Sequence, residues 1–318
     1  MNMGIGYSRV CLAGEDLDWT GGNSILLGID LKTETLFYKN DTNEIKICSD
    51  VIEQNVSIAI KDLENYIFGG NFFDYTIATL QTFNRRIYSL TGGTLYIRSN
   101  IPVKSGLCSS AACIVSIIQE LCNTYEQTLT NQEIIDLAYD IEKKELGVVV
   151  GKMDYYSAME KRLLCFHSSC DSINILDYTF NNVDLFLIDS SEESSSLENN
   201  KVKYNRYATN ESKMMEYIQS GNILVNKMIS CIENKEDIEK IGNIINQYQI
   251  IMKDKLLVST ERIDFIVNLL NKNGAIGTKI TGAGLGGYIL SFIHTMDSSN
   301  IEILLNKRGI EYKKCNLV

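Results

Sequence analysis

Residues 102–112 read Pro-Val-Lys-Ser-Gly-Leu-Cys-Ser-Ser-Ala-Ala. The mostly apolar run from Cys113 to Tyr125 follows this small-residue loop and predicts a buried helix. The start of a helix leaves backbone N–H groups unpaired and carries partial positive charge, so it attracts anions. Gly106, Ser109 and Ser110 add no bulk that would keep a phosphate away. The junction therefore predicts a phosphate-binding loop, and catalysis on a nucleotide is the leading hypothesis.

The composition limits the classes of protein to be considered. The chain has 318 residues, of which 45% are hydrophobic, and this supplies ample core for two domains. A net charge of −10 argues against nucleic acid and acidic membranes as partners, since both reward a basic face. Nine cysteines without a Cys-x-x-Cys pair, and no secretory leader at residues 1–10, predict reduced thiols in the cytoplasm. We expect no membrane span and no structural zinc site.

The order of periodic segments predicts an α+β protein with a boundary near residue 180, dividing the chain into residues 1–180 and 181–318. The predicted strands are 9–13, 24–38 with a bend at 30–32, 44–48, 94–98, 183–189, 275–281, 288–294 and 311–316. The predicted helices include 72–88, one that starts at Thr130 with Glu133 in a capping box, 238–248 and 263–270. His167 is expected to lie in a further strand.

A second glycine cluster, Thr281-Gly-Ala-Gly-Leu-Gly-Gly-Tyr288, satisfies the dinucleotide pattern G-x-G-x-x-G. That pattern requires a helix directly after the glycines, whereas residues 288–294 are strand-like, so we reject the dinucleotide interpretation. A glycine loop between two strands either brings backbone close to a ligand or another loop, or forms a tight hairpin. There is also no G-x-x-x-x-G-K-[ST] run, which argues against a P-loop enzyme.

A third cluster lies near the amino terminus, where Arg9-Val-Cys-Leu-Ala-Gly-Glu-Asp-Leu-Asp-Trp-Thr-Gly-Gly22 brings three carboxylates beside Trp19. Carboxylates accept paired hydrogen bonds from vicinal hydroxyls, and an indole packs against the apolar face of a sugar ring. The cluster therefore indicates a site for a polyhydroxylated ligand. The alternative is an exposed acidic turn, which is the commoner fate of Asp-rich loops.

Taken together and in this order, the three clusters resemble the GHMP kinases, the superfamily of galactokinase, homoserine kinase, mevalonate kinase and phosphomevalonate kinase. Residues from Pro102 onward are similar to the family's P-x-x-x-G-L-G-S-S-A loop, and residues 279–287 to its third motif. Residues 9–18 are similar to the galactokinase signature R-V-N-L-I-G-E-H-T-D. The resemblance implies a two-domain α+β fold with ATP and acceptor in the cleft between the domains. It implies transfer of the γ-phosphoryl group of ATP to a sugar or sugar derivative, at the anomeric hydroxyl.

The resemblance also implies roles for individual residues. The ATP-binding residues would be Lys104, Ser105, Gly106, Leu107, Cys108, Ser109, Ser110, Ala111, Gly282, Ala283 and Gly284. Ser110 and Glu142 would hold Mg²⁺, because a hard cation takes oxygen ligands. Asp154 would accept the proton of the attacking hydroxyl, and Arg9 would keep that carboxylate ionised. The acceptor would lie against Arg9, Glu15, Asp16, Asp18, Asp154 and Tyr204.

Other interpretations of these residues stay open at this point. Glu142 can be an ordinary half-exposed glutamate, and Asp154 can cap a helix that begins near Tyr155. Lys104 and Lys279 can neutralise phosphate or be solvated. The cysteines, including the one at 108, are interpreted as small core residues rather than nucleophiles.

Departures from the galactokinase pattern bear on the acceptor. Asp16 stands where galactokinases place histidine, Trp19 where they place tyrosine, and Cys108 where they place glycine or serine. The added negative charge suits a different hydroxyl pattern, for instance an amino sugar whose cation pairs with Asp16. Rival functions are a kinase for mevalonate or an amino alcohol, and a sugar- and nucleotide-binding regulator without turnover. The expected partner is a small molecule, and the expected state is a monomer or homodimer.

Overall fold

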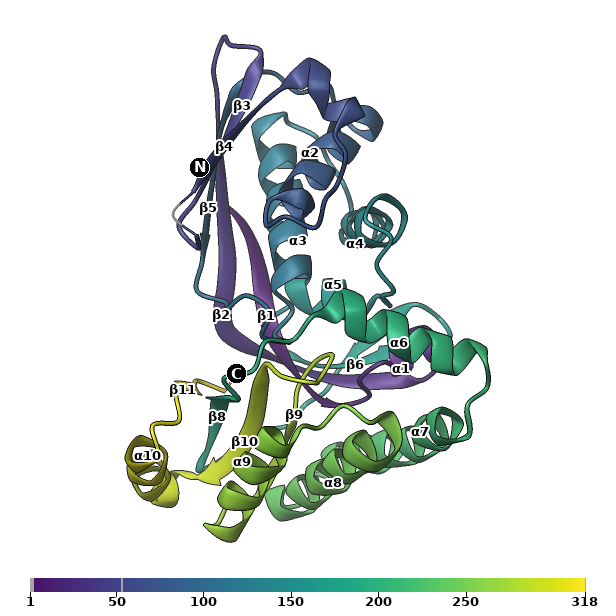
Figure 1. Ribbon diagram of the computed structural model, residues 1–318, viewed down its shortest axis with the longest axis vertical. Helices are drawn as coiled ribbons and strands as arrows, with labels where there is room; N and C mark the ends of the chain where they lie inside the picture. The colour runs from purple at the N-terminus through teal and green to yellow at the C-terminus, as the bar shows by residue number, and fades with distance from the viewer. Residues whose placement is uncertain (1–2, 53, 318) are drawn as a thin grey trace.

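The computed structural model describes residues 3–52 and 54–317, which form two β-sheets with helices packed beside them (Figure 1). The first sheet has the order β4 (Asn55–Ala59), β3 (Glu44–Ser49), β5 (Gly93–Ser99), β2 (Asn23–Lys39), β6 (Leu163–His167) and β7 (Ser172–Ile175), with β1 (Gly4–Ala13) paired to β2. The second has the order β11 (Tyr312–Cys315), β8 (Val183–Asp189), β10 (Tyr288–His294) and β9 (Gly277–Ile280). Of all these pairs, only β3 with β5 is parallel.

Helices cover the first sheet on one side and flank the second (Figure 1). Those of the first half are α1 (Leu17–Thr20), α2 (Asp74–Arg86), α3 (Ser109–Thr124), α4 (Asn131–Asp140) and α5 (Met153–Met159). Those of the second half are α6 (Ser196–Ala208), α7 (Ser212–Glu233), α8 (Ile238–Ile251), α9 (Glu261–Lys272) and α10 (Ser298–Lys307). Single π-helical turns follow α4 at Ile141–Glu145 and α8 at Met252–Leu256, and 3₁₀ turns lie at Ile60–Asn65 and Thr295–Asp297.

Strands β1 and β2 contribute to both hydrophobic cores. Cys11 and Leu26 pack in the core beneath α2–α5, whereas Val10, Leu12 and Leu27 pack in the core shared with the second sheet and α7–α9. Successive side chains of a strand point to opposite faces, and both faces are covered here. This double coverage explains the continuous apolar runs in these two strands, and it places the first acidic cluster, which follows β1, between the two halves.

The α+β prediction is confirmed, as are the capping box of Thr130 with Glu133 at the start of α4 and the strand that contains His167. The helix after the phosphate loop starts at Ser109, four residues before the predicted start. Small residues in its first turn carry no apolar periodicity, so the pattern missed them. The bend expected near Asp30 is not a break in β2. It is an irregular register, in which Tyr7 faces Lys32 but Arg9 faces Gly28.

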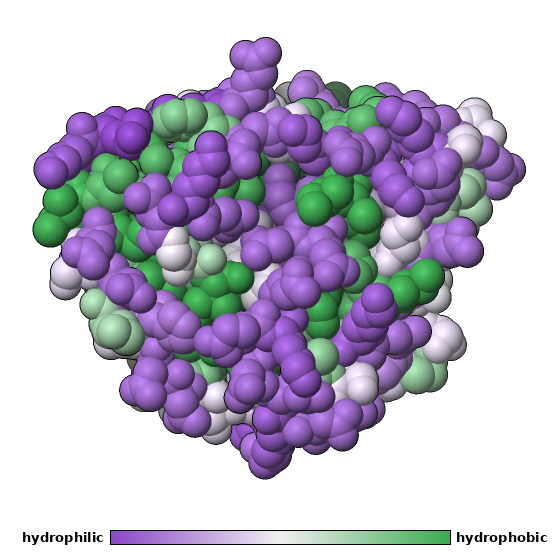
Figure 2. Space-filling model, turned by 90° about the horizontal axis from the view of Figure 1, so that it is seen from below, coloured by the Kyte–Doolittle hydropathy of each residue, from purple (hydrophilic) through white to green (hydrophobic). Residues whose placement is uncertain are grey.

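The chain passes from the first sheet to the second between β7 and β8. On this ground we propose residue 180 as the boundary between two domains, 1–180 and 181–318. None of the helices within residues 3–52 and 54–317 has both the length and the apolar character that a bilayer crossing requires. Seen from below, the molecule presents mostly hydrophilic side chains, with hydrophobic patches interrupted by them (Figure 2).

Candidate active site

Most of the predicted site residues line one pocket between the two halves. They are Arg9, Glu15, Asp16, Asp18, the loop residues 104–110, Glu142, Asp154, Gly282 and Ala283. Three predicted residues, Ala111, Tyr204 and Gly284, do not line it. Segments that are up to 270 positions apart in sequence are thus in contact, as shown by the bond from the Cys11 N–H to Thr281 Oγ1 at 3.0 Å.

The phosphate loop and the second glycine cluster pack directly on each other. Gly106 has φ +75°, and a Cβ there would lie 2.3 Å from the Thr281 carbonyl oxygen. Gly282 has φ +85°, and its Cβ would lie 2.5 Å from Gly106 Cα. The Tyr288 N–H donates to the Ser105 carbonyl at 3.0 Å. Both open alternatives for the second cluster therefore hold: it connects the antiparallel pair β9–β10, and it brings backbone against another loop.

Cys108 precedes α3 with φ +67°, in the left-handed region that favours glycine. This backbone requirement gives a physical reason for the glycine of the family loop. The Cys108 thiol donates to the Asp154 carbonyl at 3.3 Å, and burial raises its pKa well above the ordinary value. A protonated, buried thiol is a packing residue rather than a nucleophile, which agrees with the interpretation from sequence.

Arg9 and Asp154 form an ion pair in the pocket. Arg9 Nε and Nη2 both donate to Asp154 Oδ1, at 2.9 and 2.6 Å, and Nη1 donates to the Gly106 carbonyl at 2.7 Å. Arg9 is buried on β1, whereas the Asp154 side chain, in the first turn of α5, retains 29% exposure. Among the described residues no hydrogen bond engages Asp154 Oδ2, so this oxygen is available to a group inside the pocket. Asp154 does not cap α5, because that helix begins at Met153.

Glu142 is buried, which contradicts its interpretation as a half-exposed surface residue. It lies in the π-helical turn after α4, accepts a hydrogen bond from Tyr155 OH at 2.5 Å, and is hydrogen-bonded to Ser110. Burial, with a contribution from the negative charge of Asp154, raises the pKa of Glu142 to about 7. The turn after α4 therefore places a carboxylate against the start of α3.

The adjacent oxygens of Ser110 and Glu142 fit the chemistry of Mg²⁺. Among the described residues there is no group of three or more His, Cys, Asp or Glu side chains able to hold a metal by itself. Mg²⁺ in phosphoryl-transfer sites commonly uses one or two protein oxygens plus phosphates and water. An ion held by Ser110 and Glu142 would therefore take its remaining ligands from phosphate and water.

We predict that binding of MgATP releases a proton near neutral pH. Glu142 is substantially protonated below pH 7 in the free protein, and a metal ligand must be deprotonated. MgATP affinity should therefore fall as pH drops through 7, by up to about tenfold per unit, and level off above it. Calorimetry in buffers of different ionisation enthalpy measures this release, and Glu142→Gln should abolish it. Equal proton release by the variant and the wild type would assign the proton to another group.

The three carboxylates that follow β1, Glu15, Asp16 and Asp18, differ from one another in their surroundings. Glu15 forms a buried ion pair with Lys279, so that lysine neither binds phosphate nor is solvated, contrary to both interpretations from sequence. Burial raises the pKa of Glu15 despite Lys279. Burial also raises the pKa of Asp18 to about 7, helped by the charges of Asp154 and Asp16. Within the described part of the chain, Asp18 Oδ2 accepts one long hydrogen bond, from the Met153 N–H at 3.4 Å.

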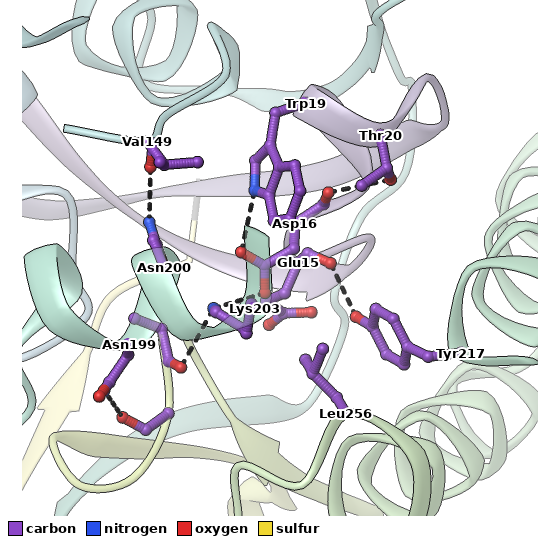
Figure 3. A network of polar contacts seen from close by, with 12 residues as sticks. Glu15, Asp16, Trp19, Thr20, Val149, Asn199, Asn200, Lys203, Tyr217 and Leu256 are labelled. Carbon is purple, nitrogen blue, oxygen red and sulfur yellow. Dashed lines mark hydrogen bonds and ion pairs between the residues drawn. The ribbon is translucent and has the colours of Figure 1, made fainter. Parts of the chain in front are cut away.

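Asp16 already has a cation from the protein itself. Lys203 Nζ donates to Asp16 Oδ2 at 2.6 Å, and Trp19 Nε1 donates to Asp16 Oδ1 at 3.1 Å (Figure 3). This corrects the expectation that Asp16 pairs with the amine of a sugar. Tyr204, which the resemblance to galactokinases placed against the acceptor, is 46% exposed on α6, whereas its neighbour Lys203 is buried.

Three contributions were missed from sequence: Lys203, Asn200 and the Tyr155 hydroxyl. The first two lie on α6, whose helical phase is not visible in a mostly polar segment. Lys203 stands next to Tyr204, but the sequence does not distinguish this lysine from the exposed polar residues of the same helix. Lys104, at the rim, pairs with Glu193 across exposed surface at 2.6 Å and contributes little to stability there.

Comparison with known proteins gives consistent matches over the whole chain. Residues 74–161 match the family described as GHMP kinases N terminal domain, and residues 228–306 match GHMP kinases C terminal. A galactokinase from Clostridium tetani is 24% identical, over 96% of this chain and 86% of its own length. The galactokinase of Lactococcus lactis complexed with galactose superposes with a TM-score of 0.86 at 16% identity. The match covers 99% of this chain and 94% of that galactokinase. The Methanococcus jannaschii mevalonate kinase superposes with a TM-score of 0.83 at 21% identity. This match covers 100% of this chain and 98% of the mevalonate kinase.

Proposed function

Because this chain belongs to the GHMP kinases, a family of phosphotransferases that use ATP, we propose that it phosphorylates a hydroxyl of a sugar or sugar derivative. The supporting observation is the pocket that the phosphate loop, Ser110, Glu142 and Asp154 line together with Trp19 and two buried oxygen atoms that have no donor among the described residues. The names of relatives favour two acceptors, galactose and mevalonate. The free oxygen atoms and the charges of the pocket favour a sugar such as galactose.

In this proposal the residues act by position and charge. The loop 104–110 and the start of α3 bind the phosphates through backbone N–H groups, and Gly282 and Ala283 close over that loop. Mg²⁺, when bound at Ser110 and Glu142, would neutralise charge on the transferring phosphoryl group. The free oxygen of Asp154 accepts the proton of the acceptor hydroxyl, while Arg9 holds the carboxylate in place.

Two buried oxygen atoms at the acceptor end lack a donor within the described part of the chain. They are Glu15 Oε2 and Asn200 Oδ1, and both residues line the pocket. Asn200 Nδ2 is engaged by the Val149 carbonyl at 2.9 Å, so only its oxygen is left for a ligand. Buried acceptors need donors, and the hydroxyls of a polyol supply them.

The charges around the pocket argue against an acidic acceptor such as mevalonate. Within residues 3–52 and 54–317, every cation that lines or borders the pocket has a carboxylate partner: Arg9 with Asp154, Lys104 with Glu193, Lys203 with Asp16, and Lys279 with Glu15. Asp18 adds a carboxyl that has no cationic partner among the described residues. A carboxylate ligand would therefore have to break an existing pair, whereas a neutral or cationic sugar would not.

An acceptor panel tests the proposal by ADP release. We expect turnover with at least one hexose or hexosamine, at a kcat/KM well above that for mevalonate or an amino alcohol, and NMR of the product identifies the phosphorylated hydroxyl. The Asp154→Asn variant serves as the inactive control. Preferred turnover of mevalonate would overturn the sugar assignment. Binding of MgATP and a hexose without any ADP release would favour the non-catalytic regulator instead.

A further inference from the structure

Helix α6 holds the indole of Trp19 through a chain of two charged groups (Figure 3). Lys203 Nζ donates to one oxygen of Asp16 at 2.6 Å, and the other oxygen accepts the indole N–H at 3.1 Å. Lys203 is 2% exposed and Asp16 is 6% exposed, so neither group is available to solvent. The direction of the indole N–H therefore depends on a carboxylate that the lysine holds in place.

The same helix also contacts the ring of Trp19. The Tyr207 ring lies edge-on to the indole at 5.7 Å between centroids, and the Tyr204 ring is tilted against it at 6.2 Å. Residues 203, 204 and 207 lie on one side of a helix, since neighbours three and four apart share a face. Residues on one face of α6 thus contact the ring of Trp19 directly and its indole N–H through Asp16. Trp19 lines the pocket.

Lys203 makes a second contact, to the other side of the pocket. Its ammonium donates to the Ala283 carbonyl at 3.3 Å, in the loop that packs on the phosphate loop. Asn199 Nδ2, one turn earlier on α6, donates to the Gly284 carbonyl at 2.8 Å. One ammonium group therefore links the acceptor segment that follows β1 to the glycine loop between β9 and β10.

Stability alone is a poor explanation for this arrangement. Desolvating an ammonium and a carboxylate costs several kcal/mol, and apolar residues of similar volume are often equally stable in such positions. Asp16 has φ +63°, a left-handed conformation that aspartate tolerates better than most residues other than glycine. A buried charge pair next to a pocket wall is better explained by what it orients.

We propose that Lys203 is a positioning residue that, through Asp16, fixes the indole of Trp19 as one wall of the acceptor pocket and so sets acceptor affinity. The inference rests on the proposed function for the identity of the pocket as an acceptor site. Its structural part does not, because the orientation of the indole can be measured without any ligand.

The measurement uses the fact that Trp19 is the only tryptophan among the 318 residues. Lys203→Met keeps the length of the side chain and removes its charge and hydrogen bonds. We expect the acrylamide quenching constant of the 295 nm-excited fluorescence to rise from the wild-type value toward that of the urea-unfolded chain. Lys203→Arg should restore most of the protection. Lys240→Met is the matched control, because Lys240 forms an exposed pair with Glu236 on the neighbouring turn.

The kinetic arm uses the hexose or hexosamine with the highest kcat/KM in the acceptor panel. Lys203→Met should raise the KM for that sugar about 10- to 100-fold, while the KM for ATP and kcat change far less. Wild-type quenching in Lys203→Met would overturn the proposal, whatever the kinetics. So would raised quenching with an unchanged sugar KM. If no sugar is turned over, the proposed function fails, and the quenching result still decides whether Lys203 orients the indole.

A second variant covers the case in which Lys203→Met does not fold because it leaves Asp16 buried without a partner. Asp16→Asn/Lys203→Met removes both charges and keeps a residue that tolerates positive φ at position 16. The same rise in quenching is expected, since a neutral amide without its lysine holds the indole less firmly. Wild-type protection in the double variant would overturn the proposal.

Discussion

Asp154→Asn is expected to lower kcat by about 10²- to 10⁴-fold, the range typical for loss of a general base. The amide keeps the size of the side chain and can still accept from Arg9, but it cannot take a proton from the acceptor hydroxyl. Affinity for MgATP, measured by calorimetry, should stay close to that of the wild type, because the Asp154 carboxylate binds Arg9 and, in the proposed function, its other oxygen serves the acceptor hydroxyl and not the phosphates.

The control for this variant is Asp177→Asn, which changes an exposed carboxylate that pairs with Lys235. It should leave both kcat and affinity unchanged. A parallel loss of turnover and of MgATP binding in Asp154→Asn would show that the residue organises the nucleotide site, and the base would then have to be sought elsewhere. Asp18, whose pKa is raised to about 7, would be the next residue to replace.

Gly106→Ala is expected to impair folding stability and MgATP binding together. A Cβ at this position would lie 2.3 Å from the Thr281 carbonyl oxygen, and φ of +75° is unfavourable for alanine. Backbone strain of about 1–2 kcal/mol and overpacking of about 1–3 kcal/mol together predict a loss of about 2–5 kcal/mol in unfolding free energy. Urea denaturation measures the loss, and calorimetry with MgATP shows whether the two loops still meet.

Gly274→Ala separates the two causes. Gly274 has φ +94°, yet nothing lies within 4 Å of a Cβ placed there, so this variant has the backbone strain without the clash. It should lose only about 1–2 kcal/mol and bind MgATP normally. Equal losses in the two variants would contradict the claim that contact between the phosphate loop and the glycine cluster shapes the site.

Local pattern predicted part of the secondary structure around the site. Alternating apolar residues predicted β1 and β2, and the capping box at Thr130 marked the start of α4, because these signals arise from neighbours in sequence. Errors came where the local signal was weak. The first turn of α3, built from small residues, was placed in the loop, and β4 and β7 were not predicted.

The partners of charged residues could not be read from the chain. Lys279 and Glu15 are 264 positions apart, and Lys203 and Asp16 are 187 positions apart. The residues that neighbour them in sequence therefore do not predict either pair. For Lys279 the sequence left phosphate binding and solvation open, and it gave no role to Lys203. Folding removed those alternatives by burying each ammonium beside one carboxylate, since a buried charge requires a partner.

The sequence by itself determined the α+β class and the kinds of chemistry available: a small-residue loop before a helix, a glycine cluster between strands, and carboxylates beside an indole. These follow from the conformational preferences of glycine, serine and apolar runs, which act over a few residues. Only the tertiary structure decided which carboxylates stay free for a ligand. Asp154 and Asp18 kept oxygens for the pocket, while Asp16 became bound to Lys203, because burial and charge pairing depend on residues that meet only when the chain has folded.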